Sequence, residues 1–595
     1  MGMKRVGREE TIMNEKKQNY LISLIVIIVF AVLCYRAFYF PVGLYEKRRM
    51  ALYIGLVLLI IFVPLLVIGI PLLNRMLAGV IARIRILGTR CTKNWRNIAK
   101  HGVLIFIGAV LVYLLTYGVC TVSGVSMNRH KFIIAIAMYA ILCVCILFRN
   151  IAYTRADILA FLVILIMGSC AILTTPRIPG TVADDDTHYR RTTEVVGFFT
   201  GSIYAAEEQV LREYVGNVQG HLYYDEESAG AYLTSLNESY RNRDIIPYDV
   251  GGLHYYHIAY IVPACGIMFG RALGLPFVYT FMMGKWFICL AYALLISASI
   301  RCVRRGKALF MAVGMIPTMV FLASAYNYDY WIVGWSIWGI AKFVSLFENE
   351  RAITNRELID IILTILIGII PKIVYFPLLF PLLFLPQNRL NKGQQVIVRI
   401  FAILIACGIC LMLLVPVLTT PGAYSDTRAE GTVSTSGQLQ YIMADPVRYI
   451  KLLITFGTQW FSTAILGRGM QDFGYVGMGD YWGIAFTVVI LAAFLDRDED
   501  STLTVKMRVA IEVGVFAAYV LVATAMYLGF TQVGSDTIQG VQSRYAYPLL
   551  APLLYAIAPN KVRITGKKEN WMIVLVLLMS LPMIWNLNTL SVALY

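Results

Sequence analysis

The sequence predicts an all-α polytopic membrane protein, built of membrane-spanning helices around two larger loops. Of its 595 residues, 59% are hydrophobic and only 14% are charged, and the mean hydropathy is +0.69. Soluble domains carry about 25% charged residues. Apolar runs of about 20 residues recur along the chain, and each can cross a hydrocarbon core of about 30 Å. Because these runs are continuous rather than alternating, we expect helices and not a barrel.

The apolar runs give the candidate spans in order, and we expect about 13–16 of them. The first, at 20–40, follows Lys16 and Lys17 and lacks a small-residue cleavage site, so it is expected to remain as a signal anchor. The pair at 358–371 and 373–386 is short and uncertain, because Pro371 and Lys372 break it. The other candidates are 50–73, 102–123, 131–149, 156–175, 256–274, 277–300, 308–325, 330–347, 400–419, 481–495, 509–530, 546–559 and 570–587.

The net charge of +16 is spread over short loops between the spans. Loop 74–101 holds seven basic residues and no acidic one, and smaller basic clusters occur at 301–307, 389–399 and 561–568. The positive-inside rule assigns these loops and the N-terminus to the cytoplasmic side of a cell membrane, with some attraction to anionic lipids. No basic groove interleaved with aromatic residues is present in the sequence, so nucleic acid is not expected as a partner.

Two longer loops are expected on the opposite, outer side. Loop 176–255 holds thirteen acidic residues, six arginines and no lysine. Loop 420–480 contains the amphipathic run 446–467, which we expect to lie along the membrane surface. In that run the apolar residues recur at helical spacing: Tyr449, Leu452, Leu453, Phe456 and Trp460.

The topology of residues 256–300 is left open by this assignment. An odd number of crossings must separate an outer loop 176–255 from an inner loop 301–307, yet two candidate spans lie between them. Either 256–274 is re-entrant or one of the loops is misplaced.

The densest polar motif is Asp184-Asp185-Asp186-Thr187-His188, about ten residues after a span. Adjacent carboxylates near lipid raise one another's pKa unless a cation or a donor is close. Such a cluster suits a general base, a metal site or an anchor for sugar hydroxyls. The alternative is a solvated acidic turn that caps the following helix.

Further candidates lie at the outer ends of spans. His254 and His257 are three residues apart, a spacing that suits a phosphate or a metal, or a packing pair in an aromatic belt. Asp329, Lys372 and Arg544 are ionisable residues at predicted outer boundaries, where such residues indicate function, and a guanidinium suits a phosphate.

Two basic residues lie inside candidate spans. Arg271 and Lys285 have two interpretations. They are either functional residues inside the membrane or side chains whose charged ends snorkel to the interface.

Several short motifs, in order, resemble the bacterial membrane-protein family called domain of unknown function 2142, which is grouped with the GT-C glycosyltransferases. The family's Pro-Asp-Glu-x-x-His resembles 183–188, where Ala183 replaces the proline and Asp185 the glutamate. The other matches are Asn-x-Asp at 327–329, Lys-x-x-Tyr-x-Pro at 372–377, Ser-Gly-Gln-Leu at 436–439 with Asp-Pro at 445–446, and Gln-Ser-Arg-Tyr-Ala-Tyr-Pro at 542–548.

The resemblance implies a GT-C-like helical core with its active site at the outer face, in which a sugar passes from a polyprenyl-phosphate donor to a glycan or lipid acceptor. Asp184 and Asp185 are then the expected catalytic acids. Asp186, His188, His254, His257, Asp329, Lys372 and Arg544 are the expected substrate-binding residues, and a divalent cation (Mg²⁺ or Mn²⁺), if any, is expected on Asp184 and Asp185.

The implied organisation is 1–150 for extra N-terminal helices, 151–559 for the catalytic core and 560–595 for a C-terminal helix. A transporter or flippase of lipid-linked saccharides, and a polysaccharide ligase or polymerase, remain alternatives.

Overall fold

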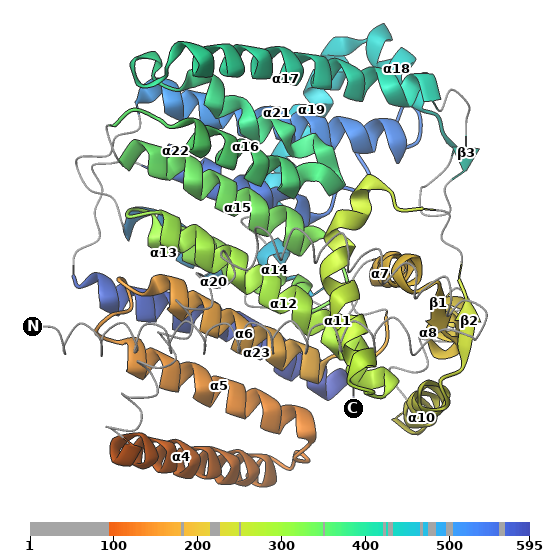
Figure 1. Ribbon diagram of the computed structural model, residues 1–595, viewed down its shortest axis with the longest axis vertical. Helices are drawn as coiled ribbons and strands as arrows, with labels where there is room; N and C mark the ends of the chain where they lie inside the picture. Colours follow the sequence, from red (N-terminus) through yellow and green to blue (C-terminus); the bar gives the residue numbers. More distant parts are fainter. Residues whose placement is uncertain are drawn as a thin grey trace, which may run out of the picture.

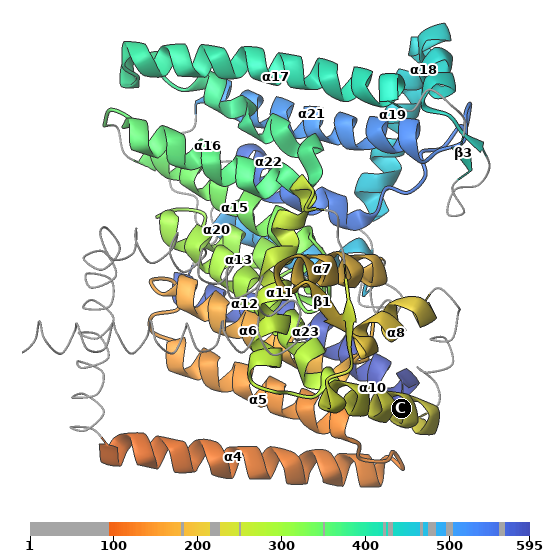
Figure 2. The same ribbon diagram turned by 45° about the vertical axis from the view of Figure 1, so that its right-hand side comes forward.

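The computed structural model is a bundle of helices that run side by side, with smaller helices and short strands gathered at one end (Figures 1 and 2). We call this end the site end; it carries α7 (Asp185–Thr200), α8 (Ala205–Tyr214) and α10 (Glu226–Asn242). The structure describes residues 95–179, 184–214, 226–248, 252–348, 351–419, 424–425, 432–463, 468–473, 483–495, 504–558 and 566–594. The expected spans at 20–40 and 50–73 lie outside these ranges.

Eight helical segments of the described chain are long and apolar enough to cross a membrane, which makes the protein an all-α polytopic membrane protein. Their apolar side chains suit the hydrocarbon core of a bilayer. Their backbone N–H and C=O groups form hydrogen bonds within each helix. The segments are Gly102–Val122, Arg129–Phe148, Ala156–Thr174, Phe277–Cys302, Asp329–Glu348, Asn355–Phe384, Val505–Gly529 and Lys568–Thr589.

The first described helices form one edge of the bundle. They are α4 (Trp95–Val122), α5 (Arg129–Phe148) and α6 (Ala156–Thr174). The α5 helix begins where the Asn128 side chain accepts a hydrogen bond from the Lys131 amide, the arrangement that satisfies a free N–H at a helix start. Helix α6 is the most buried of the three and joins this edge to the core.

The loop expected at 176–255 folds, over its described residues, into a small cap at the site end. It comprises α7 (Asp185–Thr200), β1 (Ser202–Tyr204), α8 (Ala205–Tyr214), α10 (Glu226–Asn242) and β2 (Ile245–Pro247). Strands β1 and β2 pair antiparallel, with each residue of one opposite a residue of the other.

The segment expected as a span at 256–274 does not run along the bundle. It forms η2 (Tyr255–Tyr260) and the short helix α11 (Ile261–Ala272), which crosses the ends of the neighbouring helices at the site end (Figure 1). Only α12 (Phe277–Cys302) then separates the cap from the 301–307 loop. One crossing is an odd number, so the count is consistent with the two loops lying on opposite sides.

The next expected span, 308–325, is divided by Pro317 into α13 (Lys307–Gly314) and α14 (Pro317–Leu322). Proline cannot donate a backbone hydrogen bond, so a helix commonly restarts at it. It is followed by α15 (Asp329–Ser345) and η3 (Leu346–Glu348).

The uncertain pair around Lys372 is a hairpin of α16 (Asn355–Ile369) and η4 (Ile370–Phe384). Lys372 has non-helical dihedral angles, φ −146° and ψ 78°. Beyond η5 (Gln387–Arg389), the chain is back at the opposite end, where the Arg389 side chain donates to the backbone oxygen of Leu346.

The amphipathic helix predicted within 420–480 is confirmed. The chain passes through α17 (Lys392–Thr419), β3 (Tyr424–Ser425), β4 (Thr432–Val433) and α18 (Thr435–Ala444) to α19 (Pro446–Phe461).

The expected apolar stripe of α19 faces the protein. Tyr449, Leu452, Leu453 and Phe456 pack on the α21 residues Ala523 and Tyr527. The opposite side of the helix exposes other apolar side chains: Val447, Ile450 and Ile454.

The C-terminal part of the described chain completes the bundle. Its short helical turn at residues 543–546 lies at the site end. Its elements are η7 (Arg468–Gln471), α20 (Ile484–Leu495), α21 (Val505–Gly529), η9 (Ser543–Ala546), α22 (Tyr547–Ile557) and α23 (Lys568–Leu594). Figure 1 shows α23 beside α6. The last helix of the described chain therefore packs against one of its first helices.

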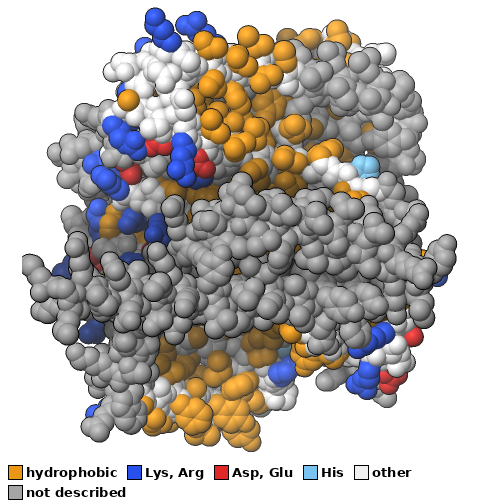
Figure 3. Space-filling view, viewed as in Figure 1, with side chains coloured by type: hydrophobic (Ala, Val, Ile, Leu, Met, Phe, Trp, Pro, Cys, Tyr) orange, Lys and Arg blue, Asp and Glu red, His pale blue; other side chains and the backbone are white. Residues whose placement is uncertain are grey.

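The end opposite the site end is rich in basic side chains. There the Tyr153 hydroxyl donates to the Arg304 backbone oxygen at 3.1 Å, and the Glu348 carboxylate accepts from the Arg304 amide at 2.8 Å. Figure 3 shows Lys and Arg side chains at this end, with apolar side chains over the helices between the ends. We call it the basic end.

Candidate functional site

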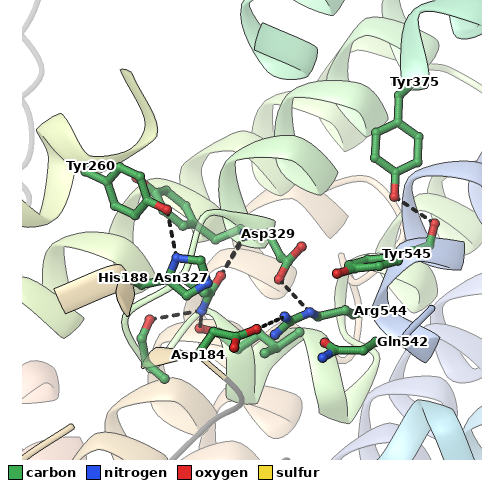
Figure 4. A network of polar contacts seen from close by, with 12 residues as sticks. Asp184, His188, Tyr260, Asn327, Asp329, Tyr375, Gln542, Arg544 and Tyr545 are labelled. Carbon is green, nitrogen blue, oxygen red and sulfur yellow. Dashed lines mark hydrogen bonds and ion pairs between the residues drawn. The ribbon is translucent and has the colours of Figure 1, made fainter. Parts of the chain in front are cut away.

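Four charged side chains from distant parts of the chain meet at the site end, and Figure 4 shows three of them, Asp184, Asp329 and Arg544. The four are Asp184 before α7, Asp329 at the start of α15, Lys372 at the η4 break and Arg544 in η9. We call these four residues the charged cluster. Asp184, Asp329 and Arg544 lie at the starts of helical segments, and Lys372 lies at the break that follows α16.

Asp184 is the most accessible acid of the cluster. Its side chain is 36% exposed, and one carboxylate oxygen lies 3.3 Å from Nη2 of Arg544. Its backbone is left-handed, with φ 64°, a conformation that aspartate tolerates better than most residues. Helix α7 starts at the next residue, and its N-terminal dipole favours negative charge there.

Asp329 is held by the turn before it. The Asn327 side-chain oxygen accepts hydrogen bonds from the amides of Asp329 at 2.8 Å and Tyr330 at 3.2 Å. This is the local bond by which asparagine starts a helix. It places the buried Asp329 carboxylate 3.2 Å from Nε of Arg544.

Arg544 joins the two carboxylates. Its side chain is 6% exposed, with Nε toward Asp329 and Nη2 toward Asp184. Burial alone lowers the pKa of this guanidinium, but Asp329, Tyr545 and other neighbours raise it above its usual value. Arg544 therefore remains a cation between two acids.

Lys372 supplies a second positive group. Its Nζ is buried and has no hydrogen-bond partner among the described residues. It lies over the ring of Tyr545, 2.9 Å from the centroid, with the Tyr328 ring 6.0 Å away. Aromatic faces stabilise a cation but give an ammonium no acceptor for its protons.

His188 lies beside the cluster on α7. Its Nδ1 is 2.7 Å from the Tyr260 hydroxyl, and its buried Nε2 has no hydrogen-bond partner among the described residues. Burial, and then the charges of Arg544 and Lys372, hold the pKa of His188 well below its usual value. The imidazole is therefore neutral near pH 7.

The other two aspartates of the motif are placed differently from Asp184. Asp185, expected to share catalysis, has no exposed surface, and its charge acts on the buried Lys285 of α12. Asp186 is half-buried, and burial raises the pKa of its carboxyl above the usual value. The motif thus divides into one accessible acid, one buried acid and one intermediate acid.

Lys285 and Arg271 do not snorkel. Lys285 donates to the backbone oxygen of Pro176 at 3.2 Å, and Arg271 pairs with Glu207 inside the cap. Both side chains are buried.

The histidine pair belongs to the frame around the cluster. His257 accepts the His254 amide at Nδ1, 2.7 Å away, so its Nε2 donates to Glu194 at 2.9 Å. Both ring nitrogens are engaged, and the His254 ring is exposed and stacks on Tyr256. The structure does not bring this pair into contact with the charged cluster.

Aromatic residues around the cluster were missed by sequence reasoning. Tyr260 binds His188, Tyr328 packs edge-on against the His188 ring at 4.9 Å, and Tyr545 lies under Lys372. Only their adjacency to Asp329 and Arg544 hinted at Tyr328 and Tyr545, and nothing in the sequence pointed from His188 to Tyr260.

A divalent cation does not fit the described side chains. Among the residues that the structure describes, no three His, Cys, Asp or Glu side chains gather as a metal site. Asp184 and Asp329 both contact Arg544, so a guanidinium already provides the positive charge between them.

Comparison with known proteins gives one match. A family described as "Predicted membrane protein (DUF2142)" matches residues 165–553, about two-thirds of the chain. All four residues of the charged cluster lie within the match. No curated protein and no solved structure matches the chain.

Proposed function

Because this chain belongs to the DUF2142 family of predicted membrane proteins, we propose that it is a membrane glycosyltransferase of the GT-C type. The donor is a sugar on a polyprenyl phosphate, and the acceptor is a hydroxyl of a cell-envelope glycan or lipid. The observation that carries this proposal is the accessible carboxylate of Asp184 next to two buried cations, Arg544 and Lys372.

The charge of the two ends supports an orientation. Arg304, Arg389 and Lys568 lie at the basic end, and the positive-inside rule places such an end in the cytoplasm. The site end and its charged cluster then face the extracytoplasmic side of the plasma membrane, where lipid-linked sugars and envelope acceptors meet.

The residues supply the two charges that this reaction needs. The Asp184 carboxylate takes the proton of the acceptor hydroxyl as its oxygen attacks the anomeric carbon. The bond between that carbon and the phosphate oxygen breaks, and its electron pair leaves with the polyprenyl phosphate. Arg544 and Lys372 stabilise the negative charge on the departing phosphate, in a buried setting where such charges act strongly.

Two nitrogen atoms, one in the charged cluster and one beside it, support a phosphate ligand. The Nζ of Lys372 and the Nε2 of His188 lack hydrogen-bond partners among the described residues. A phosphate oxygen accepts from an ammonium and from a neutral imidazole that carries its proton on Nε2. That tautomer requires Tyr260 to donate its hydroxyl proton to Nδ1.

The Asp184–Arg544 contact is compatible with a change of partner. At 3.3 Å it is longer than the 2.7–2.9 Å typical of a charge-assisted bond. A phosphate at Arg544 draws the guanidinium away from Asp184, which frees the carboxylate to accept the proton of the acceptor hydroxyl. Asp329 keeps its own contact through Nε, so Arg544 stays in place.

The position of the cluster favours an enzyme over a carrier. Secondary transporters place their charged binding site near the bilayer midplane, whereas Asp184, Asp329 and Arg544 lie at helix starts. A polysaccharide ligase or polymerase would use the same chemistry with a longer glycan.

The test uses purified protein in nanodiscs with a panel of polyprenyl-phosphate sugars and candidate acceptors, read by mass spectrometry for released polyprenyl phosphate. We expect Asp184→Asn to insert and fold normally but to reduce release by 10²- to 10⁴-fold, roughly the value of a general base.

The matched control is Asp536→Asn, which removes an exposed acid paired with Arg448 at the same end. It should leave release unchanged. If wild type releases no polyprenyl phosphate from any donor, or if Asp184→Asn is as active as wild type, the proposed reaction is wrong.

A further inference from the structure

A second buried charged network lies in the cap, away from the charged cluster. It consists of Glu207 on α8, Arg271 at the end of α11, and Tyr204 and Tyr240. It shares no residue with the Asp184 site, and the proposed glycosyl transfer does not use it.

The network holds Arg271 on three sides. Its Nη2 donates to Glu207 and its Nε to the Tyr240 hydroxyl at 3.2 Å. The Tyr240 hydroxyl in turn donates to Glu207 at 3.0 Å. The guanidinium lies over the Tyr204 ring, 4.8 Å from the centroid. Such contacts fix the orientation of the planar group.

One nitrogen of Arg271 remains without an acceptor. Its Nη1 is buried and has no hydrogen-bond partner among the described residues. A buried donor that lacks an acceptor is costly and needs an explanation. Arg271 also lines a cavity of about 210 Å³, together with Arg241 and Arg243. That volume is several times the roughly 30 Å³ share of a water molecule.

The cavity lining is positive. Of the described residues that line it, three are arginines and none is acidic, and Glu207 pairs with one of the three, Arg271. Arginines near the end of α10 also complement the dipole of that helix, so their charge alone does not show a ligand. The unsatisfied Nη1 of Arg271 is the separate observation that points to one.

Arg243 occupies a position suited to glycine. Its φ is 58°, just after α10, and the Asp244 amide donates to the Ser239 oxygen at 3.2 Å across the turn. Helices commonly end this way with glycine at the left-handed residue. The chain here accepts a strained backbone and keeps a guanidinium at the cavity.

The cavity lies at the start of a span. Gly274, Leu275 and Pro276 line it, and α12 enters its candidate span at Phe277. Residues at this depth meet lipid head groups. We propose that the cavity binds the phosphate group of a membrane lipid, through Arg271 with Arg241 and Arg243.

Two anionic lipids present that phosphate without a balancing positive charge, and the experiment separates them. The protein is placed in phosphatidylcholine nanodiscs alone, with phosphatidylglycerol, or with polyprenyl phosphate. Native mass spectrometry measures the lipid that stays bound, and thermal unfolding measures the rise in melting temperature that each lipid gives. Retention of phosphatidylglycerol identifies a phospholipid head group, and retention of polyprenyl phosphate alone identifies the carrier lipid.

The main variant combines Arg241→Gln with Arg243→Gly, because both side chains are exposed and glycine relieves the left-handed backbone. We expect an unchanged or higher melting temperature without added lipid and at least a fivefold loss of affinity for the retained lipid. The control, Arg190→Gln with Arg212→Gln, removes the same charge from other exposed positions of the cap.

The proposal is overturned if the main variant retains each lipid as well as wild type does. It is also overturned if the control variant loses as much lipid affinity as the main variant. The readout is binding, so a failure of the glycosyl-transfer assay leaves this result unaffected.

Discussion

Arg544 is the residue on which the charged cluster depends, because it contacts two carboxylates of unequal burial. The side chain of Asp329 is 5% exposed and that of Asp184 is 36% exposed. Removing the partner of a buried charge is costly, whereas an exposed carboxylate is solvated by water. The two acids are therefore separable: buried Asp329 anchors Arg544, whereas Asp184 stays accessible, as the proposed general base must be.

This division predicts the behaviour of Arg544→Gln. We expect a loss of about 3–5 kcal/mol in stability, because Asp329 is left as an unpaired buried charge, together with loss of sugar transfer. The double variant Arg544→Gln with Asp329→Asn should recover most of the stability but none of the activity. Denaturant unfolding in detergent and the nanodisc assay measure the two effects. Recovery of activity in the double variant would contradict a direct role for Arg544.

His188 gives the protein a predicted pH dependence. Its folded-state pKa lies well below 6.5, so the unfolded chain binds a proton near pH 6.5 that the folded chain does not. The stability contributed by neutral His188 is therefore complete above about pH 6.5 and is lost as the pH falls, by at most about 1.4 kcal/mol per pH unit.

Melting temperatures of wild type and His188→Gln, measured between pH 7.5 and pH 5, test this sign. The variant should lose less stability on acidification than wild type does. Parallel curves for the two proteins would show that His188 is protonated in the folded state as well.

At the scale of elements, the crossing of α11 over α12 holds the cap and the site together. The Tyr260 hydroxyl, just before α11, contacts His188, while Arg271 near its other end anchors the cap network. The crossing is close because Gly266 faces backbone atoms of Met283 and Gly284. A methyl group at 266 would lie 2.6 Å from the Met283 oxygen and 2.8 Å from the Gly284 Cα.

We therefore predict that Gly266→Ala forces the two helices apart. Overpacking of this kind costs about 1–3 kcal/mol, and the shift of Tyr260 should also reduce sugar transfer. Gly118→Ala is the matched control, since a Cβ there has no heavy atom within 4 Å and alanine favours the helix. Equal melting temperatures for Gly266→Ala and Gly118→Ala would mean that the crossing is not tight.

At the scale of the whole molecule, the two ends differ in what they carry. The basic end gathers lysines and arginines around the Arg304–Glu348 contact, and the site end carries the cap and the charged cluster. A helix bundle that alternates direction brings every second loop to the same end. The basic loops therefore gather at one end of the bundle, and the two ends lie at opposite faces of the membrane.

Labelling in intact cells checks the proposed orientation. Asp536→Cys lies at the site end with its native side chain 80% exposed, and Arg351→Cys at the basic end with 60%. A membrane-impermeant maleimide should modify the first and not the second, while wild type serves as the blank for native cysteines. Modification of Arg351→Cys alone would reverse the orientation and place the charged cluster in the cytoplasm.

The sequence alone determined the fold class and located the eight long apolar segments of the described chain, because the transfer of apolar residues into hydrocarbon is a local property of each run. It also located α19 and named all four residues of the charged cluster. It left residues 256–274 open between a span and a re-entrant segment, because an apolar run of helical length does not show whether the helix crosses the bundle or runs along it.

Only the tertiary structure decided which charges meet. Asp184 and Arg544 are 360 residues apart, and no local pattern relates them. The adjacent Asp184 and Asp185 received different environments, one accessible and one buried near Lys285, because Asp184 lies in the left-handed turn before α7 and Asp185 is the first residue of the helix.

Arg271 and Lys285 are also buried and paired. Arg271 pairs with Glu207, and Lys285 donates to the backbone oxygen of Pro176. Pairing of charges in a low-dielectric interior depends on distances set by packing, and the chain order does not contain those distances.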